Sequence, residues 1–149
     1  MAEYTQNEVQ AIELNNPINF NDSIPCRRGY IFHENGQGIF VLRGVTNNCF
    51  ARYQVTFNGN IALPTGATVA PIAVAITVNG EARPTSRAIF TPQAVEEYGN
   101  VTSTAIITVP RGCCFSLSVR AVSGITDPTD TPAPTIEVVN SSLVINRIA

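Results

Sequence analysis

An alternating strand that runs directly into an Asn-Gly pair constrains this chain more than any other feature of its sequence. Over residues 72–78, bulky aliphatic side chains alternate with Ala and Thr, as they do when one face of a β-strand is buried. Asn79-Gly80 follows at once. This pair favours a type I′ turn, because both central residues of that turn need positive φ. The segment therefore predicts a β-hairpin.

The same combination of short apolar strands and turn residues recurs along the chain. Turn signals lie at residues 34–38, 58–60, 110–112 and 140–142, and the only stretch that could form a helix is 91–98. Eight to ten antiparallel strands without a repeated unit predict an all-β fold, a jelly-roll β-sandwich.

The domain organisation follows from the same pattern. Residues 1–10 are polar and are expected to form a frayed lead, and residues 11–149 are expected to form a single jelly-roll domain. The chain closes on an apolar strand at 143–148, which we expect to pair inside a sheet rather than hang free.

The composition indicates a weakly charged surface. Charged residues make up only 13% of the 149 residues, against about a quarter in ordinary globular domains, and the nine basic residues are all arginine. Low charge is typical of a surface that is partly buried between subunits, so the composition favours an oligomer. A weakly charged monomer is the alternative.

Several classes of function are disfavoured. The net charge is −2 and there is no basic run, so we expect no nucleic-acid partner. The first residues lack the pattern of a secretory signal, and no apolar run is long enough to span a membrane. We therefore expect synthesis in the cytosol without a signal peptide, no membrane insertion, and a final place on a virion or bacterial surface.

The cysteines and the single histidine do not form a recognisable reactive site. Cys26, Cys49, Cys113 and Cys114 match no zinc spacing, and we expect them to be buried as small apolar residues. A disulfide from Cys26 and a metal site that includes His33 are the alternatives. His33 lies at a strand end before a turn, and no serine or cysteine has a base beside it in the sequence. The sequence predicts no enzyme, no cofactor and no metal site.

Four segments, taken in order, resemble the C1q/TNF-like jelly roll: residues 52–57, 72–80, 105–117 and 142–145. They look like the family's early aromatic strand, its apolar strand ending in Asn-Gly, its later pair of strands around a Gly turn, and its closing strand. The resemblance covers residues 10–149. Within the family, the chain more closely resembles the small bacterial and phage-encoded heads, such as the C-terminal domain of spore-surface collagen-like proteins. Two features depart from the family: Cys113 replaces an acidic residue, and the last strand lacks Phe-Ser-Gly.

The resemblance implies a compact homotrimer that buries an aromatic and aliphatic face. The candidates for this trimer interface or for the core are Tyr53, Val55, Phe57, Phe115 and Leu117. Partner binding is expected through loops at one end of the trimer, and its candidate residues are Asn35, Gln37, Asn47, Asn48, Asp127 and Asp130.

These observations lead to a functional hypothesis of a non-enzymatic structural or adhesive module. The chain would be a trimeric head that decorates a phage particle or a bacterial or spore surface and binds a partner through its end loops. The alternative is a carbohydrate-binding module with a glycan as its partner. That function needs exposed aromatic side chains, for which Tyr4 and Tyr98 are the main candidates.

Overall fold

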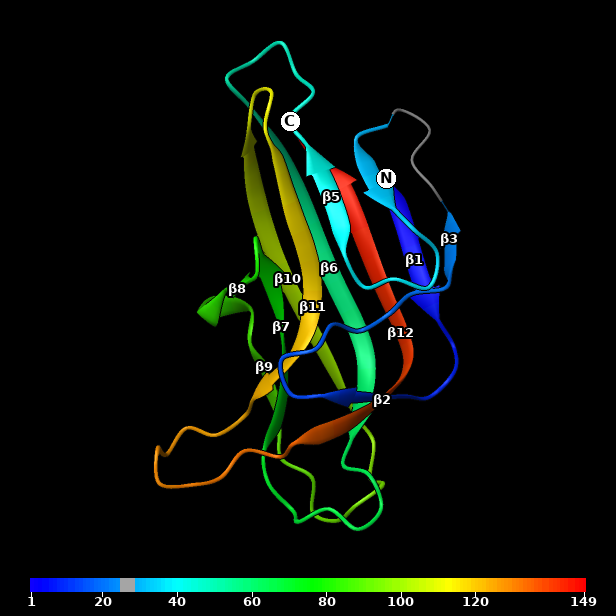
Figure 1. Cartoon of the computed structure of the whole chain (residues 1–149), viewed down its shortest axis with the longest axis vertical. Helices are drawn as coiled ribbons and strands as arrows, with labels where there is room; N and C mark the ends of the chain where they lie inside the picture. The colour runs from blue at the N-terminus through cyan, green and yellow to red at the C-terminus, as the bar shows by residue number, and fades with distance from the viewer. Residues whose placement is uncertain (25–28) are drawn as a thin grey trace.

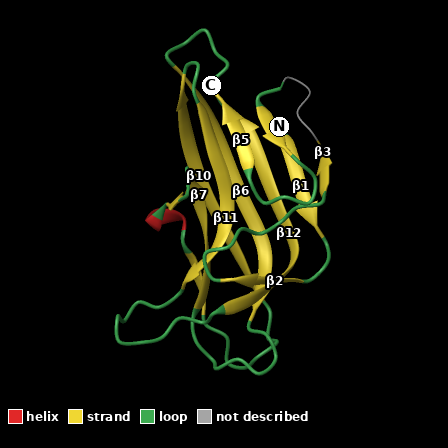
Figure 2. Cartoon of the chain, in the orientation of Figure 1, coloured by secondary structure: helices red, strands yellow, loops and turns green. Residues whose placement is uncertain are grey.

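Two antiparallel sheets form the molecule in the computed structural model, which describes residues 1–24 and 29–149 (Figures 1 and 2). Sheet A has the order β10-β6-β12-β1-β3, with β2 also paired to β12, and sheet B has the order β4-β5-β11-β7-β8, with β9 also paired to β7. The strands of sheet A are β1 (Ala2–Gln6), β2 (Gln10–Glu13), β3 (Asp22–Ile24), β6 (Phe50–Ala62), β10 (Gly99–Pro110) and β12 (Thr135–Arg147). The strands of sheet B are β4 (Ile31–His33), β5 (Phe40–Arg43), β7 (Ile72–Val78), β8 (Glu81–Ala82), β9 (Ala88–Phe90) and β11 (Cys114–Ser123).

This arrangement confirms the predicted all-β sandwich. The described residues form twelve strands rather than the expected eight to ten. The additional strands include β3, β8 and β9, which are only two or three residues long. Strands of this length are too short to show an alternating pattern in the sequence.

One apolar core fills the space between the sheets. Along β6 and β10 every second residue points inward, so that their buried and exposed side chains alternate almost without a break. Sheet A contributes Val55 and Ile107 to this core, and sheet B contributes Phe40, Leu42 and Val74; all five are fully buried.

The hairpin predicted from the Asn-Gly pair is confirmed. Asn79 and Gly80 have φ values of 53° and 82°, as a type I′ turn requires. The two strands pair directly on either side of the turn, with Val78 opposite Glu81. The signal at 34–38 likewise lies in the loop of a hairpin, in which Ile31 of β4 pairs with Leu42 of β5.

Two of the predicted turns lie inside strands instead. The 58–60 signal does not end β6, which continues to Ala62, and the 140–142 signal is a β-bulge within β12 rather than a break between two strands. The bulge interrupts the register between Val139 and Ser142, and Asn140 takes a φ of 51°. β6 lies between β10 and β12, so pairing on both of its edges outweighs the local turn preference of its Asn-Gly-Asn sequence.

The expected polar lead over residues 1–10 is wrong, because Ala2–Gln6 forms β1 inside sheet A. This strand pairs with β12 on one side and with β3 on the other. Its inward residues are Ala2 and Tyr4, and Tyr4 is only 3% exposed. The last strand, β12, lies between β6 and β1, which confirms that the chain closes inside a sheet.

The helix considered at 91–98 does not form. The described residues contain a single helical turn, the 3₁₀ turn η1 (Pro84–Ser86), and none of their helices is long and apolar enough to cross a membrane. η1 links the edges of the two sheets: the Ile76 amide donates to Ser86 Oγ at 3.0 Å, and Ser103 Oγ of β10 donates to the Ser86 carbonyl.

Candidate functional site

The two ends of the sandwich carry different loops. β6 has 13 residues, so it separates the segments before and after it by about 40 Å. Residues 44–49 precede β6 and contact the 110–113 turn, where the Gly44 amide donates to the Cys113 carbonyl at 2.8 Å. Residues 63–71 follow β6 at the opposite end, beside the loop that joins β11 to β12 (Figure 1).

The predicted partner-binding residues are therefore not brought together at one end, and that expectation is wrong. Asn47 and Asn48 lie at the end that contains the 110–113 turn, whereas Asp127 and Asp130 lie at the opposite end. Asn35 and Gln37 lie in a third place, the β4–β5 hairpin, which pairs with the backbone of Phe20. All six side chains are exposed. The sequence identified exposed loops correctly but not their separation, which the length of β6 determines.

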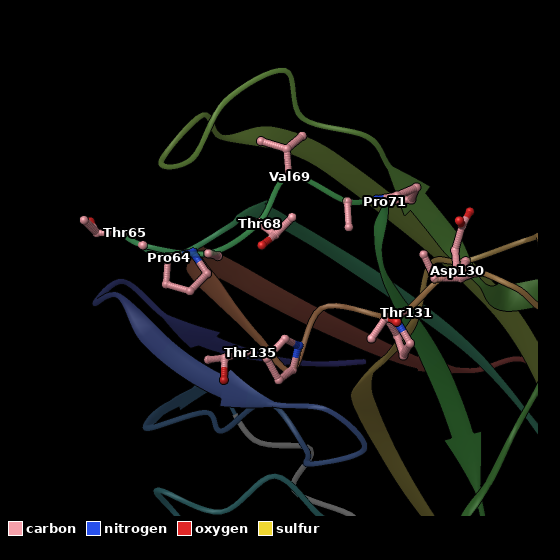
Figure 3. Close-up of a pocket in the computed structure, with 14 residues that line it drawn as sticks. Pro64, Thr65, Thr68, Val69, Pro71, Asp130, Thr131 and Thr135 are labelled. Atoms are coloured by element: carbon pink, nitrogen blue, oxygen red, sulfur yellow. The ribbon is translucent and has the colours of Figure 1, made fainter.

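A groove of about 710 Å³ lies between the β6–β7 loop and the β11–β12 loop (Figure 3). This volume falls within the range of pockets that bind small ligands. We refer to it as the end groove, and its described lining includes Pro64, Thr65, Val69, Asp130, Thr131 and Pro134.

Glycine and proline explain why these two loops form a groove rather than another pair of strands. A Cβ on Gly124 would lie 2.6 Å from the Pro71 carbonyl carbon, so only glycine lets the two loops approach this closely. Pro64, Pro71 and Pro134 lack an amide hydrogen and have a fixed φ, which opposes sheet pairing along both walls. The loops therefore meet at Gly124 and diverge around the groove.

Hydroxyl and carboxyl groups are the main polar side chains of the end groove. Thr65 Oγ1 donates to Glu96, whose own amide donates to the Leu63 carbonyl at 2.8 Å, and these bonds fix one wall. In the β11–β12 loop, but outside the described lining of the groove, Asp127 Oδ1 accepts hydrogen bonds from the Thr129 amide at 3.0 Å and from its hydroxyl at 2.9 Å. The two hydrogen bonds stabilise the carboxylate and lower the pKa of Asp127.

A second pair of side chains lies near this end of the sandwich. Tyr98 Oη donates to Glu137 Oε2 at 2.9 Å. Partial burial, followed by the hydrogen bond and the negative charge of Glu137, raises the pKa of Tyr98 above its ordinary value. Tyr98 is 40% exposed, whereas Tyr4 is buried, so the expectation that Tyr4 offers an exposed stacking surface is wrong.

The end groove offers hydroxyl, carboxylate and apolar groups for contact with a ligand. Its described lining places threonine hydroxyls and one carboxylate around proline and aliphatic surface, without an imidazole or a thiol beside them. No group of three or more His, Cys, Asp or Glu side chains in residues 1–24 and 29–149 is placed to hold a metal ion. The groove residues 64–71 were not predicted as a site, and their only sequence signal is the pair of prolines that bounds them.

His33 has a structural role in this arrangement. Its Nε2 donates to the Gln37 carbonyl at 2.8 Å, and its ring stacks on Phe40 at 4.1 Å between centroids. The Tyr4 ring meets the His33 ring edge-on at 4.8 Å. The imidazole thus packs the β4–β5 hairpin against the Tyr4 ring of β1, so that this aromatic cluster contacts both sheets.

The cysteines are not buried as expected. Cys49, Cys113 and Cys114 are all exposed free thiols, because the first two lie in the loops before β6 and β11 and the third begins β11 at its exposed end. Cys26 lies outside the described residues, so the alternative of a disulfide from Cys26 stays a prediction.

The apolar candidates belong to the core of the sandwich. Tyr53, Val55 and Phe57 are fully buried within the chain, Leu117 is 1% exposed, and Phe115 packs partly buried against the same core. Tyr53 Oη also donates to the Arg43 carbonyl at 2.5 Å, which ties β6 to β5 across the sandwich. These side chains are therefore packed inside one chain and do not offer a subunit interface.

Comparison with known proteins shows that the fold occurs in a solved structure. No protein-family model matches the sequence, and no curated protein matches it. Among solved structures, the globular domain of zebrafish complement 1qA protein matches with a TM-score of 0.59 at 13% sequence identity, over 96% of this chain and 94% of that one. This chain has the C1q-like jelly-roll fold.

A second solved structure matches this chain with a lower TM-score. The C-terminal domain of EclA, described as a sugar-binding protein, matches with a TM-score of 0.42 at 16% identity, over 95% of this chain and 80% of that one. The resemblance of residues 10–149 to a C1q-like jelly roll, predicted from four sequence segments, is thus confirmed at the level of the fold.

Proposed function

We propose that this chain is a non-enzymatic structural or adhesive module, a jelly-roll head that forms a homotrimer through the outer face of sheet A. In this proposal the end groove binds the partner. The observation that carries it is the outer face of β10, β6 and β12, a broad surface of three adjoining strands with very few charges.

Hydroxyl, amide and aliphatic side chains cover this face in rows across the strands. One row contains Thr104, Thr56 and Val144, and the next contains Ile106, Gln54 and Asn146. Ile106 is 52% exposed, which is high for a large aliphatic side chain in the middle of a strand.

The polar groups of this face largely satisfy one another. Asn100 Nδ2 donates to Asn58 Oδ1 at 2.9 Å, and Thr102 Oγ1 donates to the same oxygen at 3.0 Å. The hydroxyls of Thr56 and Thr104 lie 3.3 Å apart. A face whose hydrogen bonds are internally paired loses little when a second subunit covers it, and depletion of charge is typical of an interface core.

The end groove would remain accessible in such a trimer. It lies beyond the end of β6, whereas the proposed interface is the outer surface of the strands themselves. Figure 1 shows the N- and C-terminal residues at the end opposite the groove. A head held near either terminus would present the groove outward, which supports our proposal that it decorates a phage particle or a bacterial or spore surface.

The mass of the protein in solution tests the proposal directly. Size-exclusion chromatography with light scattering should give about three times the 16.0 kDa chain mass. Because Cys49, Cys113 and Cys114 are exposed thiols, the mass is measured with and without reductant. A trimer seen only without reductant would indicate disulfide cross-linking instead. A monomer in both buffers would contradict the proposed function.

The carbohydrate-binding alternative depends on Tyr98. This ring is 40% exposed and lies near the end groove, but its hydroxyl is already bonded to Glu137. Stacking on sugars would therefore use the ring face with the hydroxyl held in place. Glycan-array binding that is lost in Tyr98→Ala would favour this alternative over a protein partner.

A further inference from the structure

A second hollow lies on the outer face of sheet B, separate from the end groove and from the outer face of sheet A. Its volume is about 510 Å³, and its lining includes Asn15, Ala75, Arg83, Arg87, Val122 and Ser123. We refer to it as the arginine hollow. A volume of this size falls within the range of small-ligand pockets.

Strand pairing places one arginine on each side of Ala75, which lines this hollow; Arg87 also belongs to the described lining, whereas Arg120 is its strand neighbour outside that lining. Ala75 in β7 pairs directly with Arg120 in β11. On its other side, the β7–β9 ladder ends at the pair Val74 and Ala88, and continuing its register by one residue brings Arg87, just before β9, opposite Ala75. Side chains that are opposite each other in adjacent strands project from the same face. The row Arg87–Ala75–Arg120 therefore has a methyl group between two long cationic side chains.

Each arginine is anchored by a single hydrogen bond. Arg87 Nη1 donates to the Ser123 carbonyl at 3.2 Å, Arg120 Nε donates to Ser118 Oγ at 3.2 Å, and Arg83 Nη1 donates to the Ile106 carbonyl at 3.0 Å. A guanidinium group has five N–H donors, so most of the donors on each of these groups are unused. The anchors hold the side chains in place and leave hydrogen-bonding capacity for another molecule.

These positive charges lack acidic partners among residues 1–24 and 29–149. None of the three arginines forms an ion pair with an acidic residue in the part of the chain that the structure describes. The described lining of the hollow contains no carboxylate either. Arginines gathered without acidic partners create a local positive potential, which a bound anion would relieve.

We propose that the arginine hollow binds a small ligand that carries a carboxylate or sulfate group. The planar guanidinium fork matches the geometry of such oxyanions, and hydrogen bonds between charged groups of this kind are among the strongest that proteins make. The ligand is either a free anion or an acidic sugar. Asn15 and Ser123 offer hydrogen bonds for sugar hydroxyls, and Val122 and Pro84 offer apolar contact for a sugar ring.

This inference does not depend on the proposed trimer or on the end groove. The arginine hollow is lined by Asn15 and by residues of β7, β8, β11 and the segment around η1, none of which belongs to β10, β6 or β12; only the Arg83 side chain reaches β10, where it bonds to the Ile106 backbone carbonyl. Failure of anion binding would leave the trimer proposal intact, and a monomeric protein would leave the hollow intact. The two proposals are therefore tested separately.

The test is a titration of the full chain, followed by two-dimensional amide NMR. Glucuronic acid is the probe, glucose is its uncharged control, and acetate and sulfate are the free-anion controls at matched ionic strength. We expect saturable shifts of the Ala75, Val122 and Ser123 amides with glucuronic acid and none with glucose. Equal affinity for acetate and glucuronic acid would support the oxyanion site and assign it to free anions.

Matched arginine variants identify the groups responsible. Arg87→Gln and Arg120→Gln should each raise the dissociation constant about tenfold, as expected for the loss of one charged hydrogen-bonding group. Arg87→Lys, which keeps the charge but not the fork, should weaken binding less. Arg111→Gln, at an exposed position in the 110–113 turn, is the control and should bind as the unaltered chain does.

If glucuronic acid, acetate and sulfate all fail to shift these amides at saturating concentration, the hollow does not bind oxyanions. An equal loss in Arg111→Gln would show non-specific attraction to arginine and would also overturn the site. Retained amide dispersion in each variant shows that the chain is folded, so a failure to bind cannot be attributed to unfolding.

Discussion

Gly80 shows how one residue sets the geometry of a hairpin. Its φ of 82° lies in the left-handed region, where a Cβ is strained, although no atom lies within 4 Å of the position that a Cβ would take. Gly80→Ala should therefore lower the free energy of unfolding by about 1 kcal/mol through backbone strain alone. Chemical denaturation measures this change. Gly80→Asn should cost less, because Asn tolerates this conformation better, and the reverse order would contradict the argument.

The titration of Tyr98 reports the effect of burial and of the neighbouring Glu137 on its phenol group. Its pKa is raised, first by burial and then by Glu137, so the folded state holds the phenol proton more tightly than the unfolded state does. The stability that Tyr98 contributes is therefore present below pH 10, the usual pKa of the phenol, and is lost as the pH rises through the folded-state value.

Glu137→Gln removes the charge beside Tyr98 and should lower the pKa of Tyr98 towards its ordinary value. Burial is unchanged, so part of the elevation should remain. Ultraviolet absorbance of the phenolate measures the titration, and Tyr98→Phe identifies which transition belongs to Tyr98. Glu8→Gln, at an exposed position outside the strands, is the control. An unchanged Tyr98 titration in Glu137→Gln would contradict the assigned cause.

At the scale of elements, the bulge in β12 and the glycine in β6 fit one another. Ser141 in the bulge is 2% exposed, and its hydroxyl has no hydrogen-bond partner among the residues that the structure describes. Its Cβ lies 3.5 Å from where a Cβ on Gly59 would be. That Cβ would also lie 2.9 Å from Phe57 Cζ. The small size of Gly59 thus leaves the room that the bulge occupies.

The unpartnered hydroxyl leads to a prediction about stability. Ser141→Ala should leave the free energy of unfolding unchanged or raise it by about 1 kcal/mol, because it removes a buried polar group that makes no bond. Gly59→Ala at the facing position should lower the stability, since the Phe57 ring must move. Thermal unfolding of the two variants gives the comparison. A clear loss of stability in Ser141→Ala would show that the hydroxyl has a partner in solution.

The sequence predicts elements that depend on neighbours in the chain and misses those that depend on distant ones. Asn79-Gly80 forms its turn because both φ values are local properties of the two residues. The sequence at 140–142 has comparable turn preference, but pairing with β6 converts it into a bulge. β1 looks polar in the sequence, because only its inward residues Ala2 and Tyr4 are apolar or aromatic, and its strand identity comes from β12.

The candidate sites also divide into residues that local sequence predicts and residues that only distant contacts bring together. The alternation of apolar and polar residues along 52–57 predicts that Tyr53, Val55 and Phe57 face the same side of the strand, and all three are core residues. The end groove joins residues 64–71 to residues 125–135, and the arginine hollow joins three different strands. No local pattern marks either hollow, because each is made by contacts between segments that are far apart in the sequence.

At the scale of the whole molecule, the two outer faces of the sandwich differ in what they can contact. The outer face of sheet A has paired polar groups and few charges, whereas the outer face of sheet B carries the arginine hollow. If the subunits meet through sheet A, a charge placed at Ile106 should disrupt the trimer, because an unpaired buried charge is strongly unfavourable in an interface.

Ile106→Arg should therefore give a monomer with nearly unchanged thermal stability, since the side chain is exposed in the single chain. Phe32→Arg is the matched control, because Phe32 is 62% exposed but lies in β4 of sheet B. Light scattering compares the masses of the two variants with that of the unaltered chain. A trimer that survives Ile106→Arg and dissociates in Phe32→Arg would place the interface on the other sheet.

The central position of β12 determines when this protein can fold during its synthesis. β12 separates β6 from β1, so until residues 135–147 have left the ribosome, sheet A lacks the strand that joins its two halves. Until then, β1 and β6 each have one unpaired edge, the edge that β12 later covers, and such edges promote aggregation. Pairing of the first strand with the last also makes folding slow relative to folds with mostly local contacts. A stalled or truncated chain that lacks β12 would be a substrate for chaperones and proteases rather than a folded domain.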